Sequence, residues 1–468
     1  MFFQCVSSSH TLKTPGVGVI EPLSWLMAQP PPQLPAEVWI LIFGHLSVSD
    51  KFRIRESCKF FKRLVDHASL WRGWTVILRF KGGSYNSDFW SSLRRRKVLS
   101  AVVKSAKAKD WKRLSLCLPD LSTVVLDLNS QTSLSQLRGF PHLKRLVVRN
   151  RDCSDLVSDF FPPCLGQQLT HLSICGVTFP ITSTERVISA LSQFTHLTSL
   201  TCHHMRVHGE TFCVIESMIT HLPKLKRLSV SVTPAVCDFS RAPVSSPRRC
   251  EWTRRQTATA DLSSLELIDC WDFSFPPDVM MLMPGLSSLA VFYKRTCHEA
   301  SEQWSFHGCH LQTWLRHFSQ LSSLVVVRGP PVKMYAASIP ATVTSLTLCV
   351  AGLRPEDLAA IALQVPGLLH LHVDPWPSHL GARTADIPQL FPKLKSLALR
   401  HRYVPEEDFL SLQKLQDLKH LKILDCHPGV SELINKLRAV TRFKLSITVS
   451  SQTADVLSLK DKSKQCQK

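Results

Sequence analysis

The residues best suited to metal chemistry lie in one short segment of the sequence, CHEASEQWSFHGCH, which contains Cys297, His298, His307, Cys309 and His310. Thiolate and imidazole groups are ligands that suit Zn²⁺. The order Cys-x9-His-x-Cys matches no standard zinc motif, however, and the sequence has no CxxC pair to complete such a site. Two interpretations stay open, a weak zinc site at Cys297, His307, Cys309 and His310 or a plain polar loop that holds core cysteines.

Motifs of enzyme chemistry are missing from the sequence. HEASE places Glu302 where the HExxH motif of zinc proteases carries its second histidine, and no GxxxxGK, GxGxxG or GxSxG segment occurs. Five cysteines lie on or beside predicted strands, where a buried structural thiol is commoner than a nucleophile; they are Cys175, Cys202, Cys270, Cys349 and Cys426. We therefore predict a protein that is not an enzyme and needs no cofactor.

The chain is strongly basic, with 56 Lys and Arg against 36 Asp and Glu, a formal net charge of +20. Such a charge favours acidic proteins, nucleic acid or anionic lipid without choosing among them. The densest basic run is Arg94, Arg95, Arg96, Lys97, Lys104, Lys107, Lys109, Lys112 and Arg113. We interpret it as the solvated face of a helix over residues 94–113, or else as a nuclear-import signal or a phosphate contact. Aromatic residues do not alternate with these charges, which disfavours nucleic acid.

Cysteine usage indicates a reducing compartment. The 16 cysteines follow no regular framework, which predicts free thiols in the cytoplasm, the nucleus or both. No apolar run reaches the ~18 residues of a membrane span, so no membrane partner is expected. Residues 1–32 are expected to form a disordered leader, and residues 449–468 a polar tail.

The elements that position these residues repeat along the chain. HLKRLVVRN, QLTHLSICG, HLTSLTCHH and KLKRLSVSV share apolar residues at positions 1, 4 and 6 counted from their first leucines, Leu143, Leu169, Leu197 and Leu225. The pattern returns at Leu262, Leu286, Leu321, Val343, Leu368, Leu394, Leu418 and, more weakly, Val440. A period of ~20–29 residues with this pattern marks leucine-rich repeats.

Each repeat predicts a short parallel strand on a concave face and a returning helix on a convex face. The expected fold class is therefore α/β, with a solenoid over residues 114–448. Thr182 or Ser183, Pro355 and the segment PEEDFLSLQKL indicate starts of return helices. Two longer intervals predict insertions at residues 234–260 and 294–312.

Residues 74–113 come before the clear repeats and are expected to join the solenoid to the N-terminal region. Trp74–Phe80 predicts a first strand. A basic helix should follow, with an apolar stripe at Leu99, Val102, Val103 and Ala106, and Leu114 and Leu116 should begin the next strand.

The stretch LPAEVWILIFGHLSVSDKF, residues 34–52, predicts a helix that is apolar nearly all round, because Glu37 and His45 are almost its only polar breaks before Leu46. Such a helix must be covered on more than one face. Ser49 is expected to cap a second helix that begins near Asp50. A unit of about forty residues is marginal alone and needs a partner to complete its core.

This order of residues resembles the F-box over residues 33–73, and with the repeats the chain resembles F-box and leucine-rich-repeat proteins. The matching positions are Leu34, Pro35, Glu37, Ile42, Phe43, Leu46, Asp50, Cys58, Leu64 and Trp71. The segment Phe52-Arg53-Ile54 departs from the family's usual Leu-Arg and small apolar residue. The resemblance implies an all-helical F-box that docks on the adaptor of an SCF (cullin–RING) ubiquitin ligase through Leu34, Pro35, Glu37, Ile42, Phe43, Leu46, Cys58, Leu64 and Trp71.

The resemblance also implies that the repeats bind a protein substrate for ubiquitination. Side chains that alternate with the buried leucines should face the concave surface; we select Arg145, Arg149, Arg227, Phe292, Val325, Val327, His370, His372 and Arg400. They predict an apolar centre with positive ends, a surface that fits a protein, and an acidic one at those ends. The alternative is a ligase-independent scaffold, or a nuclear RNA-associated protein that uses residues 94–113.

Overall fold

The spacing of apolar residues divides the chain into a short helical region and a long series of strands. The computed structural model describes residues 34–81, 85–127, 134–149, 163–176, 189, 191–203, 211–231, 261–270, 277–280, 282–296, 309–375, 380–401, 404–424, 429–442 and 444–450. The chain forms two compact units, Met1–Leu146 and Val147–Lys468. In the described part, no helix is both long enough and apolar enough to cross a membrane.

The N-terminal helical region contains α1 (Ala36–Gly44), α2 (Val48–Ser57), α3 (Lys59–Val65) and the 3₁₀ helix η2 (Ala68–Trp71). Pro35 precedes the first residue of α1. Ser47, rather than Ser49, caps α2, because its hydroxyl accepts the Asp50 N–H at 3.2 Å. The extended backbone of Cys58 ends α2, and its Sγ accepts the Phe61 N–H at 3.4 Å to begin α3.

The core of this region is aromatic. Phe43 and Trp71 are buried, and so is Val65 between them in the chain. The Phe61 ring meets the rings of Trp39 and Phe43 edge-on, with centroids 4.9 and 5.4 Å apart. Such edge-to-face pairs add to the stabilisation that burial gives. Since these rings take one side of α1, its other side is left outside the core.

The strands are β1 (Thr75–Arg79), β2 (Ser100–Lys104), β3 (Thr123–Asp127), β4 (Arg145–Arg149), β5 (His171–Cys175), β6 (Ser199–His203), β7 (Arg227–Ser231), β8 (Ser264–Cys270), β9 (Ser288–Thr296), β10 (Ser323–Gly329), β11 (Ser345–Cys349), β12 (His370–Val373), β13 (Ser396–Arg400), β14 (His420–Leu424) and β15 (Ser446–Ser450). Each pairs with the next in chain order, giving an open sheet of fifteen described strands. The pairing is parallel and nearly always in register, with register shifts between Ile268 and Cys270 of β8 and between Val327 and Gly329 of β10.

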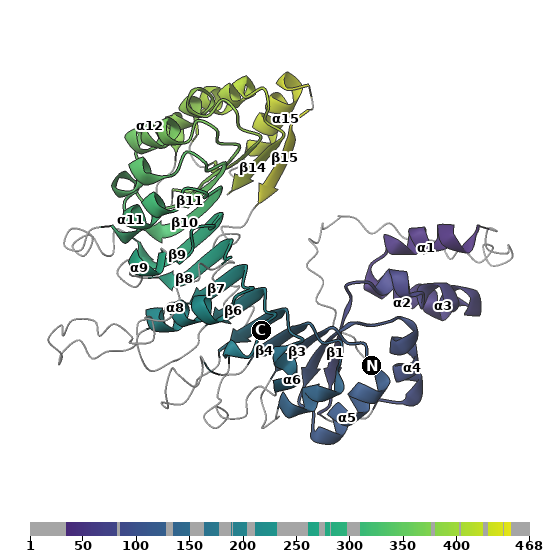
Figure 1. Cartoon of the computed structure of the whole chain (residues 1–468). Coiled ribbons are helices and arrows are strands. Elements are labelled where there is room, and N and C mark those ends of the chain that lie inside the picture. The colour runs from purple at the N-terminus through teal and green to yellow at the C-terminus, as the bar shows by residue number, and fades with distance from the viewer. Residues whose placement is uncertain are drawn as a thin grey trace, which may run out of the picture. The chain divides into compact units, whose positions relative to one another are not determined.

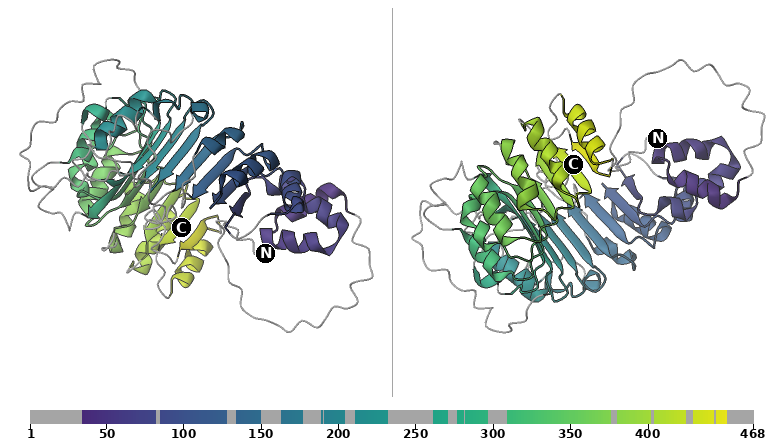
Figure 2. Two further views of the ribbon diagram at one scale, coloured as in Figure 1. Left: turned by 90° about the horizontal axis from the view of Figure 1, so that it is seen from below. Right: turned by 90° about the horizontal axis from the view of Figure 1, so that it is seen from above.

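The helices between these strands are α4 (Ser87–Arg95), α5 (Ala108–Cys117), η3 (Leu134–Gly139), α6 (Pro163–Gly166), α8 (Thr211–His221), α9 (Pro277–Met280), α11 (His310–His317), η6 (Val332–Met334), η7 (Ala336–Ser338), α12 (Pro355–Gln364), η8 (Gly381–Asp386), α13 (Ile387–Leu390), α14 (Glu406–Leu410), η9 (Ser411–Lys414) and α15 (Val430–Val440). Within the second unit they cover one face of the sheet, and the strands line the other (Figure 1, Figure 2). This is the arrangement of a leucine-rich-repeat solenoid.

Burial confirms the predicted repeat positions, because every predicted first position of a repeat from Leu143 to Leu418 is buried. Leu418 is the most exposed of them at 8 %. One position differs. Val440 is 54 % exposed, because α15 continues through it. The last strand is β15, where Ile447 takes the buried position.

Residues 74–113 also differ in part from the prediction. The first strand is present as β1, but residues 94–113 form the end of α4, then β2 and the start of α5 instead of one basic helix. The segment Ser100–Lys104 alternates buried and half-buried side chains, with Ala101 and Val103 inside. β-branched valines with that period favour a strand. Leu114 is buried on α5 rather than at the start of a strand.

Several predicted features lie outside the described residues. They are the leader, the insertion core at 234–260, the segment that holds Cys297, His298 and His307, the helix start at Thr182 or Ser183, Cys426, and residues 451–468.

Candidate functional site

The exposed side of α1 carries an apolar surface. Leu34, Val38, Leu41 and Ile42 are 38, 36, 69 and 41 % exposed, and Phe60 at the start of α3 is 38 % exposed. Spacings of three and four residues place Val38, Leu41 and Ile42 on one face of α1, and Leu34 lies two residues before the helix begins. We call these five residues the α1 surface. An isolated domain gains nothing from exposing such side chains, so the surface indicates a binding site.

The predicted docking residues divide by their exposure. Leu34, Pro35, Glu37, Ile42 and Cys58 are exposed, Leu46 and Leu64 are half-buried, and Phe43 and Trp71 are buried. Phe43 and Trp71 therefore support the α1 surface from inside instead of forming it. The docking residues expected from the sequence omit Val38, Leu41 and Phe60, although the three- and four-residue spacings from Val38 to Leu41 and Ile42 within α1 could have identified the first two.

A family model described as F-box-like matches residues 32–73. Residues 32–73 are an F-box-like domain. Together with the leucine-rich repeats that follow, this makes the chain consistent with an F-box and leucine-rich-repeat protein. The match begins one residue before the predicted boundary and ends at the predicted one.

No curated protein matches the chain. Two solved structures resemble it at 14 % identity: an internalin from Listeria monocytogenes with a TM-score of 0.38, covering 74 % of this chain and 89 % of that one, and the leucine-rich-repeat-containing protein LegL7 from Legionella pneumophila with a TM-score of 0.36, covering 80 % and 98 %. The description of the solenoid depends on this chain's own strands and leucines.

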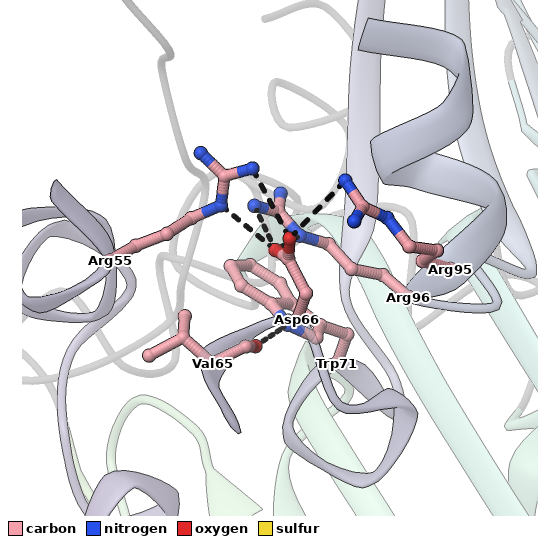
Figure 3. Close-up of polar contacts among 6 residues, drawn as sticks. All are labelled: Arg55, Val65, Asp66, Trp71, Arg95 and Arg96. Carbon is pink, nitrogen blue, oxygen red and sulfur yellow. Dashed lines mark hydrogen bonds and ion pairs between the residues drawn. The ribbon is translucent and has the colours of Figure 1, made fainter. Parts of the chain in front are cut away.

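An arginine cluster joins the F-box-like domain to α4 in the first unit (Figure 3). The Asp66 carboxylate, at the end of α3, accepts hydrogen bonds from Arg55 Nε at 2.9 Å and from Arg96 Nε at 2.8 Å. Arg95 Nη2 lies 3.7 Å from the same carboxylate. The Arg96 guanidinium also lies 4.2 Å from the centre of the Trp71 ring. A planar guanidinium suits both contacts at once.

Electrostatics keep Asp66 ionised. Burial raises the pKa of the Asp66 carboxyl, but hydrogen bonds and positive charges from Arg55 and Arg96 outweigh it, so the pKa lies below its ordinary value. Because Asp66 is on the F-box-like domain and Arg96 follows α4, the cluster fixes these two segments to each other.

Two residues of the basic run make contacts within the fold. Arg96 has a side chain only 3 % exposed, and Arg94 donates to the Leu116 and Cys117 carbonyls at the end of α5. Cationic groups at the last carbonyls of a helix stabilise it. Burial of Arg96 removes one charge from the surface that the nuclear or RNA-binding interpretation requires, while Arg94 stays exposed.

The strand face of the solenoid carries the residues selected for substrate binding. Arg145, Arg227 and His370 are exposed, while Arg149, Phe292, Val325, Val327 and His372 are half-buried. The register places Val327 beside Phe292, and Ile268 of β8 on its other side. The predicted apolar centre is therefore contiguous across three strands.

Arg400 differs from that prediction in its exposure. It is 4 % exposed, and its Nε and Nη2 donate to the two carboxylate oxygens of Asp374 at 2.6 and 3.0 Å. In a bidentate pair of this kind, the guanidinium is bound by a carboxylate inside the protein. Arg400 therefore presents no free charge at the end of the face.

The cysteines on the strands are buried thiols. Burial raises the pKa of Cys202 to about 12, and burial with the nearby Asp374 charge raises the pKa of Cys349 further. A thiol in that state is a poor nucleophile. Cys309 is buried before α11, and the described residues contain no group of three metal-binding side chains.

The F-box-like domain and the leucine-rich repeats are both interaction modules, which supports a protein-interaction adaptor.

Proposed function

We propose that this protein is the substrate-recognition subunit of an SCF (cullin–RING) ubiquitin ligase. The α1 surface carries the proposal, because a small F-box-like domain exposes Leu41 and Ile42 on a helix whose other side already holds its core. Adding a partner subunit would cover these side chains and complete the core of the domain.

The solenoid would hold a protein substrate on its strand face. In this role the chain supplies proximity instead of chemistry, since holding a substrate lysine near the conjugating enzyme raises its effective concentration. The cluster of Asp66 with Arg55 and Arg96 supports that role, because it fixes the docking domain to the first segment of the solenoid.

The test is capture of the purified SCF adaptor by the full-length chain. The double variant Leu41→Asp/Ile42→Asp should weaken capture at least tenfold, because both side chains are exposed and would be desolvated in the complex. Leu363→Asp is the matched control, since Leu363 is 82 % exposed on α12 of the other unit. It should capture adaptor like the unmodified chain.

Failure of the unmodified protein to capture the adaptor, with circular dichroism showing a folded chain, would refute the proposal. Equal weakening by Leu363→Asp would show that the effect of the double variant is not specific to the α1 surface.

A further inference from the structure

A half-buried carboxylate, Glu266, lies on the strand face of the second unit. Glu266 lies at the third position of β8, between Ser229 of β7 and Ala290 of β9 in register. The neighbouring residues Leu265 and Leu267 are fully buried on the helix side. Since side chains alternate along a strand, Glu266 faces the side that the helices leave uncovered.

A hydrogen-bonded chain of two residues orients this carboxylate. Ser229 Oγ donates to Glu266 Oε2 at 2.5 Å. Because the serine hydrogen is committed there, Ser229 Oγ accepts from His203 Nε2 at 2.7 Å. A carboxylate can accept about four hydrogen bonds, and Ser229 supplies one of them.

Glu266 makes no ion pair in the described part of the chain. Both neighbouring strands carry a cation. Arg227 of β7 extends across β6, and its Nη2 lies 3.4 Å from His171 Nε2. Lys294 of β9 lies four residues after Ala290, the register partner of Glu266. Asp374, a further acid on this face, pairs with Arg400. Glu266 is therefore a half-buried negative charge that no described cation neutralises, on a chain with a net charge of +20.

The apolar side chains on the same face adjoin this charge. Ala290 and Val325 continue the row of Glu266, and Ile268, Phe292 and Val327 form the next row along β8, β9 and β10. We call these five residues the β8–β10 strip. A charge and an apolar strip side by side fit a ligand that carries both kinds of group.

We propose that Glu266 and the β8–β10 strip bind a substrate segment that places an arginine or lysine beside a bulky apolar side chain. This inference rests on the proposed role as a substrate receptor and names the chemistry that the strand face selects. The basic side chain pairs with the open oxygens of Glu266, and the apolar side chain covers Phe292 and Val327. The acidic partner expected from overall charge would meet repulsion at this point of the face.

A random peptide library displayed on phage, selected on the full-length protein, tests the sequence preference. We expect enrichment of Arg or Lys within two positions of Leu, Ile, Phe or Trp. Selection on Glu266→Gln should keep the apolar preference and lose the basic one. This variant keeps the carbonyl that accepts from Ser229, so the fold should survive. Enrichment of acidic residues on the unmodified protein, or no enrichment, overturns the proposal.

Affinity measurements with one enriched peptide and its Arg→Glu counterpart give the decisive comparison. By fluorescence anisotropy, Glu266→Gln should weaken the basic peptide about tenfold, and Glu266→Lys should reverse the preference between the two peptides. Glu356→Gln, on the exposed start of α12, is the matched control and should change neither affinity. Equal affinities for the unmodified protein and Glu266→Gln overturn the proposal.

Adaptor capture is measured on the same preparations, so the two proposals can fail separately. A lost peptide preference with intact adaptor capture refutes only the strand-face site. Intact peptide preference without adaptor capture refutes the ligase role and leaves the peptide site standing.

Discussion

At the scale of single residues, Asp66 is expected to contribute strongly to stability. Its carboxylate is the shared partner of Arg55 and of Arg96, whose guanidinium is buried against Trp71. Removing one member of a buried pair costs more than the pair contributes, because the other charge stays buried and uncompensated.

We therefore predict that Asp66→Asn lowers the free energy of unfolding by about 3 kcal/mol at neutral pH. Urea denaturation followed by tryptophan fluorescence measures the change. Arg95→Gln is the control, because the Arg95 side chain is 58 % exposed and such pairs contribute at most about 1 kcal/mol. A loss as large for Arg95→Gln would contradict the assignment.

The depressed pKa of Asp66 gives this prediction a pH dependence. A carboxyl whose folded pKa lies below its unfolded value contributes stability that is complete above about pH 5 and is lost as pH falls through the folded pKa. The difference between the unmodified protein and Asp66→Asn should therefore be constant from neutral pH to about pH 5 and shrink on further acidification. A difference that grows in acid would rule out an ionised, paired Asp66.

At the scale of elements, serine and threonine hydroxyls connect neighbouring repeats. Oγ of Ser263, Ser287 and Ser322 each donates at 3.0 Å to a backbone carbonyl of the preceding repeat, on Lys226, Ser263 and Ser287 respectively. The Ser263 carbonyl also accepts the N–H groups of Ser287 and Ser288. These bonds secure the point where each strand enters the sheet.

Ser287→Ala should lower the free energy of unfolding by about 1 kcal/mol, the net value of one hydrogen bond. Ser287→Thr should retain most of it, since Thr344 makes the same contact to Ser322. The adjacent Ser288→Ala serves as the control and should stay within about 0.5 kcal/mol. Denaturant titrations of the three variants make the comparison, and equal losses for Ser287→Ala and Ser288→Ala would contradict it.

The same elements show how much of the fold can be predicted from the sequence. Repeating leucines locate β4 to β14, because each must be buried for the repeats to stack. The single helix predicted over residues 94–113 is wrong, because Val102 and Val103 fit both the helical and the strand period. Pairing with β1 and β3 makes this segment a strand. The α1 surface follows from helical spacing, whereas the Asp66 cluster and the Ser229–Glu266 bond join distant residues and leave no local signal.

At the scale of the whole molecule, the two proposed surfaces belong to different compact units. The α1 surface depends on the aromatic core of the F-box-like domain. The position of Glu266 depends on the pairing of strands within the second unit, Val147–Lys468. A receptor that works by proximity needs both surfaces on one chain, but neither needs to change when the other is occupied.

We therefore predict that the two sites are energetically independent. Leu41→Asp/Ile42→Asp should change peptide affinity less than twofold, and Glu266→Gln should change adaptor affinity equally little. In the combined variant, the two losses measured separately should both appear unchanged, since distant sites without shared partners are additive within about 0.5 kcal/mol.

Anisotropy with the enriched peptide, with and without saturating adaptor, provides the most direct measurement. Adaptor binding that shifts peptide affinity more than about fivefold would reveal coupling of about 1 kcal/mol between the units. The chain would then act as a switch between substrate and ligase. Equal affinities would support a passive receptor, in which transfer to the substrate depends only on simultaneous binding at the α1 surface and at Glu266.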